Sequence, residues 1–240
     1  MRLDVYLTEK GICRSRSAAQ QLISLGGVAV NGRIAAKNSL EISDLDVVEI
    51  EELKLPKYVG RGGQKLEKAL EHWAISVEGK TCLDIGASTG GFTDCMLQNG
   101  AARVFAVDVG SGQLHEKLRA DERVVSLEQT DIRDFELPSG TAADFVGTDV
   151  SFISLKLILP HIFRFLKDGG TAVALIKPQF EVGKQALNKK GVVKSEAARL
   201  KCVSEIKEFS AQCGFKVIGT IESPITGGDG NVEYLLAIKK

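Results

Sequence analysis

The chain has 240 residues, of which 44% are hydrophobic, and its 31 lysines and arginines balance 31 aspartates and glutamates. Such a chain can bury one medium and one small core, and its balanced charge excludes a uniformly basic nucleic-acid binder, so any nucleic-acid surface must be a local patch. Five scattered cysteines without a C-x-x-C pair indicate reduced thiols in a cytoplasmic protein and favour neither a disulfide framework nor a metal site. No run approaches the roughly 18 apolar residues of a membrane span, so we expect no membrane partner.

The N-terminal part of the chain predicts a small α/β domain. Residues 13–27 predict one helix that closes at two glycines, VAVNGRIA predicts a β-hairpin with its turn at Asn31-Gly32, and DVVEIEEL predicts a further strand. A change of composition around Pro56 marks the end of this part. We therefore expect one domain at residues 1–55, a linker at 56–60 and a second domain at 61–240.

The second domain alternates helical and strand patterns, which predicts parallel βαβ units and an α/β fold with a doubly wound, Rossmann-like sheet. Helices are expected at residues 64–73, 92–98, 155–166 and 195–212. Strands are expected at residues 82–85, 104–107, 124–127, 145–148, 172–176, 216–221 and 234–238.

A glycine turn after the first of these strands, TCLDIGASTGGFTDC, is typical of an adenosyl-cofactor site at the strand ends. Asp108 follows the turn by about 20 residues, where an acid binds a ribose hydroxyl pair. Asp131 is placed either to reach an adenine amine or to cap a helix. The turn also fits the G-x-S-x-G elbow of a hydrolase, with a triad of Ser88, Asp149 and His161, or a glycine turn without a ligand.

Two lysines and two acids from distant segments form a second candidate group: Lys65, Asp149, Lys177 and Glu233. Each stands at an expected strand end or beside a glycine-rich segment. Taken singly, each would be read as a solvated surface residue. Buried together, they would have to neutralise one another.

These residues, with VGRGGQKL, TDVSFISL, LIKPQFEVGK and SPITGGDGNVEYL, resemble the TlyA family of ribosomal RNA 2′-O-methyltransferases, which is FtsJ-like and carries an N-terminal S-four (S4) RNA-binding domain. The resemblance implies a Rossmann-like methyltransferase sheet that uses S-adenosyl-L-methionine, and it implies that the four charged residues are catalytic. Lys177 would orient the hydroxyl or remove its proton, Asp149 would hold Lys177, and Glu233 would orient Lys65 or the ribose. The expected cofactor-binding residues are Asp84, Gly86, Ser88, Gly90, Gly91, Phe92, Asp108 and Asp131.

The resemblance also implies ribosomal RNA or a ribosomal subunit as the partner, with cytidine as the modified nucleotide. Basic and polar side chains suited to phosphate oxygens lie in the N-terminal domain, at its end and in a lysine-rich loop after Lys177. The expected RNA-binding residues are Arg2, Arg14, Ser15, Arg16, Gln20, Asn31, Arg33, Lys37, Arg61, Lys184, Lys189 and Lys190. Solvated surfaces of no special function are the alternative reading of these residues. For the whole chain, the alternatives are a ribosome-associated RNA-binding protein without transferase activity and a haemolysin-type membrane-active protein.

Overall fold

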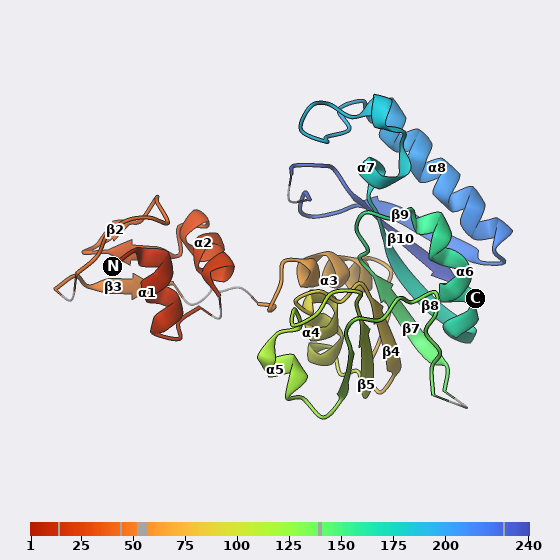
Figure 1. Cartoon of the computed structure of the whole chain (residues 1–240), viewed down its shortest axis with the longest axis horizontal. Helices are drawn as coiled ribbons and strands as arrows, with labels where there is room; N and C mark the ends of the chain where they lie inside the picture. The colour runs from red at the N-terminus through yellow and green to blue at the C-terminus, as the bar shows by residue number, and fades with distance from the viewer. Residues whose placement is uncertain (14, 44, 52–56, 139–140, 228) are drawn as a thin grey trace. The chain divides into compact units, whose positions relative to one another are not determined.

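The computed structural model describes residues 1–13, 15–43, 45–51, 57–138, 141–227 and 229–240. The chain forms two compact units, Met1–Arg61 and Gly62–Lys240, which are considered separately (Figure 1). Residues 52–56, where the first domain was expected to end and the linker to begin, lie outside the described residues, and so does Arg14. The expected domain bounds stay a prediction.

The first unit packs two helices, α1 (Leu3–Glu9) and α2 (Arg16–Ser24), with a small antiparallel sheet of order β2-β1-β3. Its strands are β1 (Val28–Val30), β2 (Arg33–Ile34) and β3 (Val48–Ile50). The hairpin confirms the turn expected from the sequence, because Asn31 and Gly32 both have positive φ, 51° and 76°, as a type I′ turn requires.

The helices of this unit correct the sequence analysis in two ways. Helix α2 is shorter than the expected 13–27, since the Ser15 side chain caps its start by accepting a hydrogen bond from the Ala18 amide. Helix α1 was not expected at all. It is only seven residues long, too short for a clear helical period, and it forms because Leu3 and Leu7 lie on one face and are fully buried in the core of the unit.

The second unit is built on a seven-stranded sheet of order β6-β5-β4-β7-β8-β10-β9 (Figure 1). Five neighbouring strands are parallel, β6 (Val124–Leu127), β5 (Arg103–Val107), β4 (Thr81–Ile85), β7 (Ala143–Thr148) and β8 (Leu166–Ile176). Strand β10 (Tyr234–Lys239) runs antiparallel to both β8 and β9 (Lys216–Glu222). Strand order reverses at β4, between β5 and β7, and this reversal opens a crevice at the carboxyl ends of the strands.

The start of β10 lies at the same edge of the sheet as the ends of the parallel strands, because Tyr234 pairs with Ile176, the last residue of β8. Residues that follow β4, β5, β7 and β8 can therefore meet residues that precede β10. The core beneath this edge is apolar and fully buried, with Leu83, Val146 and Leu236 from three of the strands.

The helices of this unit are α3 (Gly62–His72), α4 (Gly91–Gln98), α5 (Glu116–Arg119), α6 (Leu159–Phe165), α7 (Pro178–Glu181) and α8 (Glu196–Gln212), with 3₁₀ turns at Leu155–Leu157 and Lys184–Ala186. The single helix expected at 155–166 is divided. Ser154 caps the first 3₁₀ turn, α6 starts anew with Pro160 in its first turn, and β8 begins at Leu166, six residues before the expected start. In the described parts of the chain, no helix is both long and apolar enough to cross a membrane.

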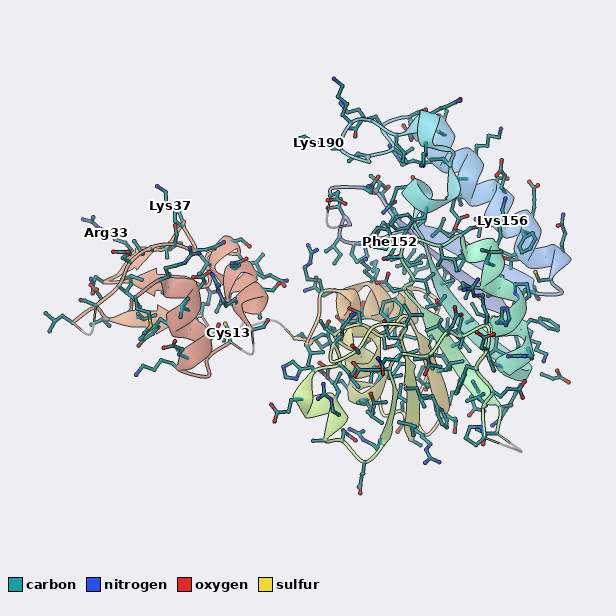
Figure 2. The ribbon with its side chains drawn as sticks, viewed as in Figure 1. Cys13, Arg33, Lys37, Phe152, Lys156 and Lys190 are labelled. Carbon is teal, nitrogen blue, oxygen red and sulfur yellow. The ribbon has the colours of Figure 1, made fainter. Side chains whose placement is uncertain are left out.

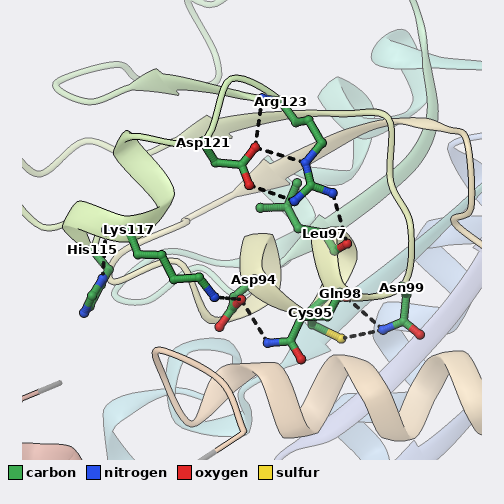
Figure 3. A network of polar contacts seen from close by, with 9 residues as sticks. All are labelled: Asp94, Cys95, Leu97, Gln98, Asn99, His115, Lys117, Asp121 and Arg123. Atoms are coloured by element: carbon green, nitrogen blue, oxygen red, sulfur yellow. Dashed lines mark hydrogen bonds and ion pairs between the residues drawn. The ribbon is translucent and has the colours of Figure 1, made fainter. Parts of the chain in front are cut away.

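Helix α4, which follows the glycine turn, is tied to the chain beyond β5 by polar contacts (Figure 3). Lys117 of α5 lies 3.8 Å from the nearly buried Asp94 carboxylate. Near the other end of α4, Arg123 is paired with Asp121 and also donates to the Leu97 carbonyl oxygen. These contacts fix the helix whose first residues border the glycine turn.

Candidate functional site

Two glycines shape the turn after β4. Gly86 has a φ of 82°, and a Cβ atom there would lie 2.9 Å from the carbonyl oxygen of Asp149. Gly90 has a φ of 94°, and its Cβ would overlap the Leu118 side chain. Only glycine meets both demands, a left-handed backbone and close approach to a neighbouring segment. The turn after β4 is therefore held directly against the turn after β7.

A pocket of about 470 Å³ opens at the carboxyl ends of β4, β5 and β7. Five of the residues expected from the sequence line it: Gly86, Ser88, Asp108, Asp131 and Asp149. Four other expected residues, Asp84, Gly90, Gly91 and Phe92, are not part of its lining. The Phe92 ring is 3% exposed and lies against Gly147 of β7, so it packs in the core beneath the pocket.

The carboxylate of Asp108 is held by backbone amides. It accepts hydrogen bonds from Ser88 N at 2.8 Å and Gly110 N at 2.7 Å, and each oxygen keeps capacity to accept a further bond in the pocket that Asp108 lines. Nearby, Glu128 accepts bonds from the amides of residues 112–114, which lowers its pKa and fixes the segment between β5 and α5.

Asp131 is paired with its neighbour Arg133, whose guanidinium lies 2.6 Å from the carboxylate and holds the pKa of Asp131 at about 2. Residues 132–134 form a turn, so Asp131 does not cap a helix as the alternative reading had it. Its carboxylate is therefore an ionised acceptor at neutral pH in the wall of the pocket.

Asp84 lies at the base of the site and is fully buried. One carboxylate oxygen accepts two bonds from Thr93, from its amide at 2.9 Å and its hydroxyl at 2.6 Å. The other oxygen, Oδ1, is buried and has no hydrogen-bond partner among the described residues. Burial raises the pKa of Asp84 to about 7, against the opposing effect of the Thr93 hydrogen bonds.

The four charged residues predicted from distant segments come together in space. Lys65 Nζ lies 2.7 Å from Glu233 Oε2 and 3.6 Å from Asp149 Oδ2, and Lys177 Nζ lies 2.6 Å from Asp149 Oδ1. Their side chains are between 2% and 19% exposed. Two cations and two anions thus alternate along one chain of contacts, which offsets the cost of removing each charge from water.

Different elements deliver these four side chains. Lys65 stands in the first turn of α3, whose Leu66, Ala69 and Leu70 are buried. Asp149 and Lys177 directly follow β7 and β8, and Glu233 directly precedes β10. Asp149 also lines the pocket, so one carboxylate belongs to both parts of the site.

Two residues of the site were not found from the sequence. Lys177 donates a 2.7 Å hydrogen bond to the Ser151 hydroxyl, and both Ser151 and Phe152 line the pocket. Phe152 has a φ of 64°, and its ring is 89% exposed (Figure 2). The available signal was their place directly after Asp149 in a strand-end turn, where ligand-binding residues gather.

The predicted RNA-binding residues of the first unit differ in what their side chains do. Arg2, Arg16 and Gln20 all donate to the fully buried carboxylate of Asp4. Asn31 binds Asp46. Ser15 caps α2, as described above, whereas Arg33 and Lys37 are exposed and extend from the hairpin side of the unit (Figure 2). Arg61, at the end of the unit, is exposed as well.

In the second unit, Lys184, Lys189 and Lys190 are exposed on the loop that follows α7. Figure 2 labels Lys190 on this loop. The buried side chain of Asn231 holds this loop by accepting from Val193 N and donating to the Gly191 carbonyl oxygen. Asn231 lies two residues before Glu233, so the lysine-bearing loop is attached to the segment that supplies an acid to the site.

The hydrolase reading finds no support in the geometry. His161 lies in helix α6 and does not line the pocket that Ser88 and Asp149 share. Within the described ranges, no hydrogen bond joins His161 to either residue.

Comparisons with known proteins agree with this geometry. Residues 58–240 match the family model of FtsJ-like methyltransferases, and residues 1–48 match that of the S4 domain. Hemolysin A of Brachyspira hyodysenteriae is 45% identical over 98% of both chains. The 16S/23S rRNA (cytidine-2′-O)-methyltransferase TlyA of Mycobacterium tuberculosis is 41% identical, with 99% of this chain and 89% of that one covered. A solved structure from Streptococcus thermophilus, provisionally described as a hemolysin, is 43% identical and superposes with a TM-score of 0.79, covering 100% of this chain and 88% of the other.

Proposed function

The chain belongs to the TlyA family of FtsJ-like methyltransferases that carry an S4 domain, and from this premise we propose that it transfers a methyl group from S-adenosyl-L-methionine to a ribose 2′-hydroxyl of ribosomal RNA. The observation that carries the proposal is Asp149, which lines the strand-end pocket and contacts both lysines of the charged group. A site for a methyl donor and a site for an acceptor hydroxyl therefore share one carboxylate. Cytidine is the proposed nucleotide, as in the name of the M. tuberculosis relative.

The pocket suits the proposed cofactor in size and in chemistry. Its volume of about 470 Å³ is in the usual range for small-molecule sites, and Gly86 lets the Asp149 segment pack against the turn that borders the pocket. Asp108 would accept the ribose hydroxyls, and Asp131 would accept the adenine amine. The pocket begins one residue after Asp84, whose buried Oδ1 has no hydrogen-bond partner among the described residues.

The protein's part in the reaction is alignment and proton removal. S-adenosylmethionine, when bound, supplies a methyl group on a sulfonium, which is a good leaving group. Lys177 orients the acceptor hydroxyl and takes its proton, while Asp149 holds Lys177 in place. Glu233 holds Lys65 at the other side of Asp149, so that Lys65 fixes the second oxygen of that carboxylate.

The exposed ring of Phe152 gives the acceptor side an apolar surface. An 89% exposed phenylalanine in the wall of the pocket is available for contact with a ligand. Single-stranded or extruded nucleotides are commonly held by stacking of their bases on aromatic side chains. We assign Phe152 to the base of the nucleotide whose ribose is methylated.

The S4 unit and the lysine-bearing loop would hold the RNA, with phosphate contacts that position it without reading its sequence. The exposed cations proposed for this are Arg33 and Lys37 in the first unit and Lys184, Lys189 and Lys190 in the second. Because its proposed partner is ribosomal RNA or a ribosomal subunit, we place the activity in the cytoplasm.

Transfer of a labelled methyl group from S-adenosylmethionine to ribosomal RNA or subunits tests the proposal. We expect transfer by the wild-type chain and loss of transfer in Lys177→Ala, with cofactor binding retained. Lys156→Ala is the matched control, since Lys156 pairs with Glu205 away from the site and its replacement should leave transfer unchanged. If the wild-type chain bound RNA but transferred no methyl group to any ribosomal substrate, it would instead be a ribosome-associated RNA-binding protein without transferase activity.

A further inference from the structure

The two turns that carry Asp149 and Lys177 are joined by a set of adjacent contacts. Lys177 donates to Ser151, the Phe152 and Phe180 rings lie 5.1 Å apart between centroids, and Glu181 accepts from the Ser154 hydroxyl. The Glu181 carboxylate also accepts from Leu155 N at 2.6 Å. The segment after β7 and the segment after β8 are thus in contact through several neighbouring side chains. Of these contacts, the one from Ser151 reaches the proposed base itself.

The two acceptors around Lys177 Nζ are not equivalent. The contact with Asp149 Oδ1 is a close ion pair of 2.6 Å, yet among the described residues that oxygen has no partner with hydrogen-bond geometry. The contact with Ser151 Oγ, at 2.7 Å, is an aligned hydrogen bond. Direction at the nitrogen is therefore set by Ser151, and charge compensation by Asp149.

We propose that Ser151 is a positioning residue for the methyl transfer, and that it fixes the direction in which the Lys177 nitrogen meets the acceptor hydroxyl. This inference rests on the proposed function. To act as the base, the Lys177 ammonium first gives one proton to solvent, and the neutral amine that results has two N–H bonds and one lone pair. With one N–H donated to Ser151 and the rest of the amine held by its close contact with Asp149, the lone pair is directed away from both groups and accepts the proton of the 2′-hydroxyl. In that step the 2′-oxygen gains the methyl group, the sulfonium becomes a thioether, and the hydroxyl proton forms the third N–H bond of Lys177.

Without the Ser151 hydroxyl, the terminal amine can turn about its last carbon–nitrogen bond among three staggered positions. Misdirection of this kind slows the chemical step while substrate contacts elsewhere remain intact. A small displacement of a reacting group can cost on the order of a hundredfold in rate. The expected signature is a fall in kcat without a matching rise in KM for RNA or cofactor.

The test measures single-turnover methyl transfer by the full chain under saturating cofactor and RNA. Ser151→Ala and Ser151→Val should each lower the rate by about tenfold to a hundredfold. Ser151→Thr keeps the hydroxyl in a side chain of the same shape as valine and should restore most of the rate. Ser204→Ala is the control, because its hydroxyl binds Glu208 on the exposed side of α8 and not Lys177, and it should keep the wild-type rate.

Each outcome decides the inference. A Ser151→Val rate equal to that of Ser151→Thr would overturn it, because shape alone would then account for the effect. A rise in KM with unchanged kcat would overturn it as well, since Ser151 would then act in binding. Folding is checked by cofactor affinity and by the unfolding midpoint, and Ser151 is exposed, so its replacement leaves the core intact. An inactive wild-type chain would contradict the proposed function. An active wild type with an equally active Ser151→Ala variant would contradict only the proposed role of Ser151.

Discussion

Asp84 is an acid that the fold keeps protonated to near neutrality. Its pKa is raised from an ordinary value of 3.8 to about 7 because the carboxyl is fully buried and one oxygen has no donor among the described residues. The folded state therefore binds this proton more tightly than the unfolded state does. The stability that comes from the protonated carboxyl is fully present below about pH 4 and is lost as pH rises to about 7.

We expect Asp84→Asn to remove this pH dependence. The free energy of unfolding of the wild type should fall relative to that of the variant between pH 4 and 7, by up to about 1.4 kcal/mol per pH unit. Urea unfolding followed by the fluorescence of Trp73, the single tryptophan of the chain, reports on the second unit directly. If the difference in unfolding free energy between wild type and variant stayed constant from pH 4 to 7, Asp84 would be ionised throughout this range.

Phe152 should matter for RNA and not for cofactor. Replacing its exposed ring by alanine removes the proposed stacking surface, which is worth about 1–3 kcal/mol per base in single-strand binding. Phe152→Ala should raise KM for RNA and leave cofactor affinity unchanged in calorimetry, and Phe152→Tyr should behave like the wild type. If Phe152→Ala had the same KM for RNA as the wild type, the base of the nucleotide would have to contact another residue.

At the scale of elements, the turn after β4 and the turn after β7 act as one unit. Gly86→Ala would add a Cβ 2.9 Å from the backbone oxygen of Asp149, in a left-handed conformation that costs about 1–3 kcal/mol for other residues. We expect it to lower cofactor affinity and methyl transfer together. Gly112→Ala is the control, because its φ of 65° brings similar strain while nothing lies within 4 Å of its Cβ. Similar losses in both variants would mean that strain, and not contact with the Asp149 segment, accounts for the effect.

The strands and the glycine turn could be predicted because each buried strand is a short apolar run that ends in a polar residue. The short helices could not be predicted, because α1, α5 and α7 span only one or two turns. Their formation depends on tertiary contacts, and they are too short to show a helical period. The strand-end positions of Asp108 and Asp149 follow from pattern alone. The role of Ser151 depends on a side-chain direction in an irregular turn, and no pattern encodes that. The members of the charged group were put together by their joint placement at strand ends and glycine-rich segments, because each member alone looks like an ordinary surface charge. Their catalytic roles were taken from the family resemblance.

At the scale of the whole molecule, a net charge of zero makes RNA binding depend on where the cations are held. Asp4 partly neutralises Arg2 and Arg16 in the first unit, whereas Arg33 and Lys37 are exposed, with no side-chain acid in contact among the described residues. The hairpin is therefore the stronger candidate for phosphate contacts.

Replacing Arg33 and Lys37 together by alanine should weaken RNA binding at low salt. The slope of log affinity against log salt should become shallower by about one for each phosphate that the variant no longer neutralises. Titration of the full chain with ribosomal RNA at several salt concentrations measures this slope. Lys156→Ala with Lys201→Ala removes equal charge from cations that both pair with Glu205, and it should leave the slope unchanged. An unchanged slope in the hairpin variant would move the RNA surface to another part of the chain.

The bond between Lys65 and Glu233 joins residues that are 168 positions apart. Strand β10, which brings Glu233 to the site, enters the sheet between two strands made earlier, β8 and β9. During synthesis, the first unit and the strands around the pocket emerge long before this acid does, and domains fold in order as they emerge. A growing chain can thus form its first unit while the second unit, which holds both Lys65 and Glu233, is still incomplete. The charged group is therefore complete only after residue 233 has left the ribosome that is making the protein.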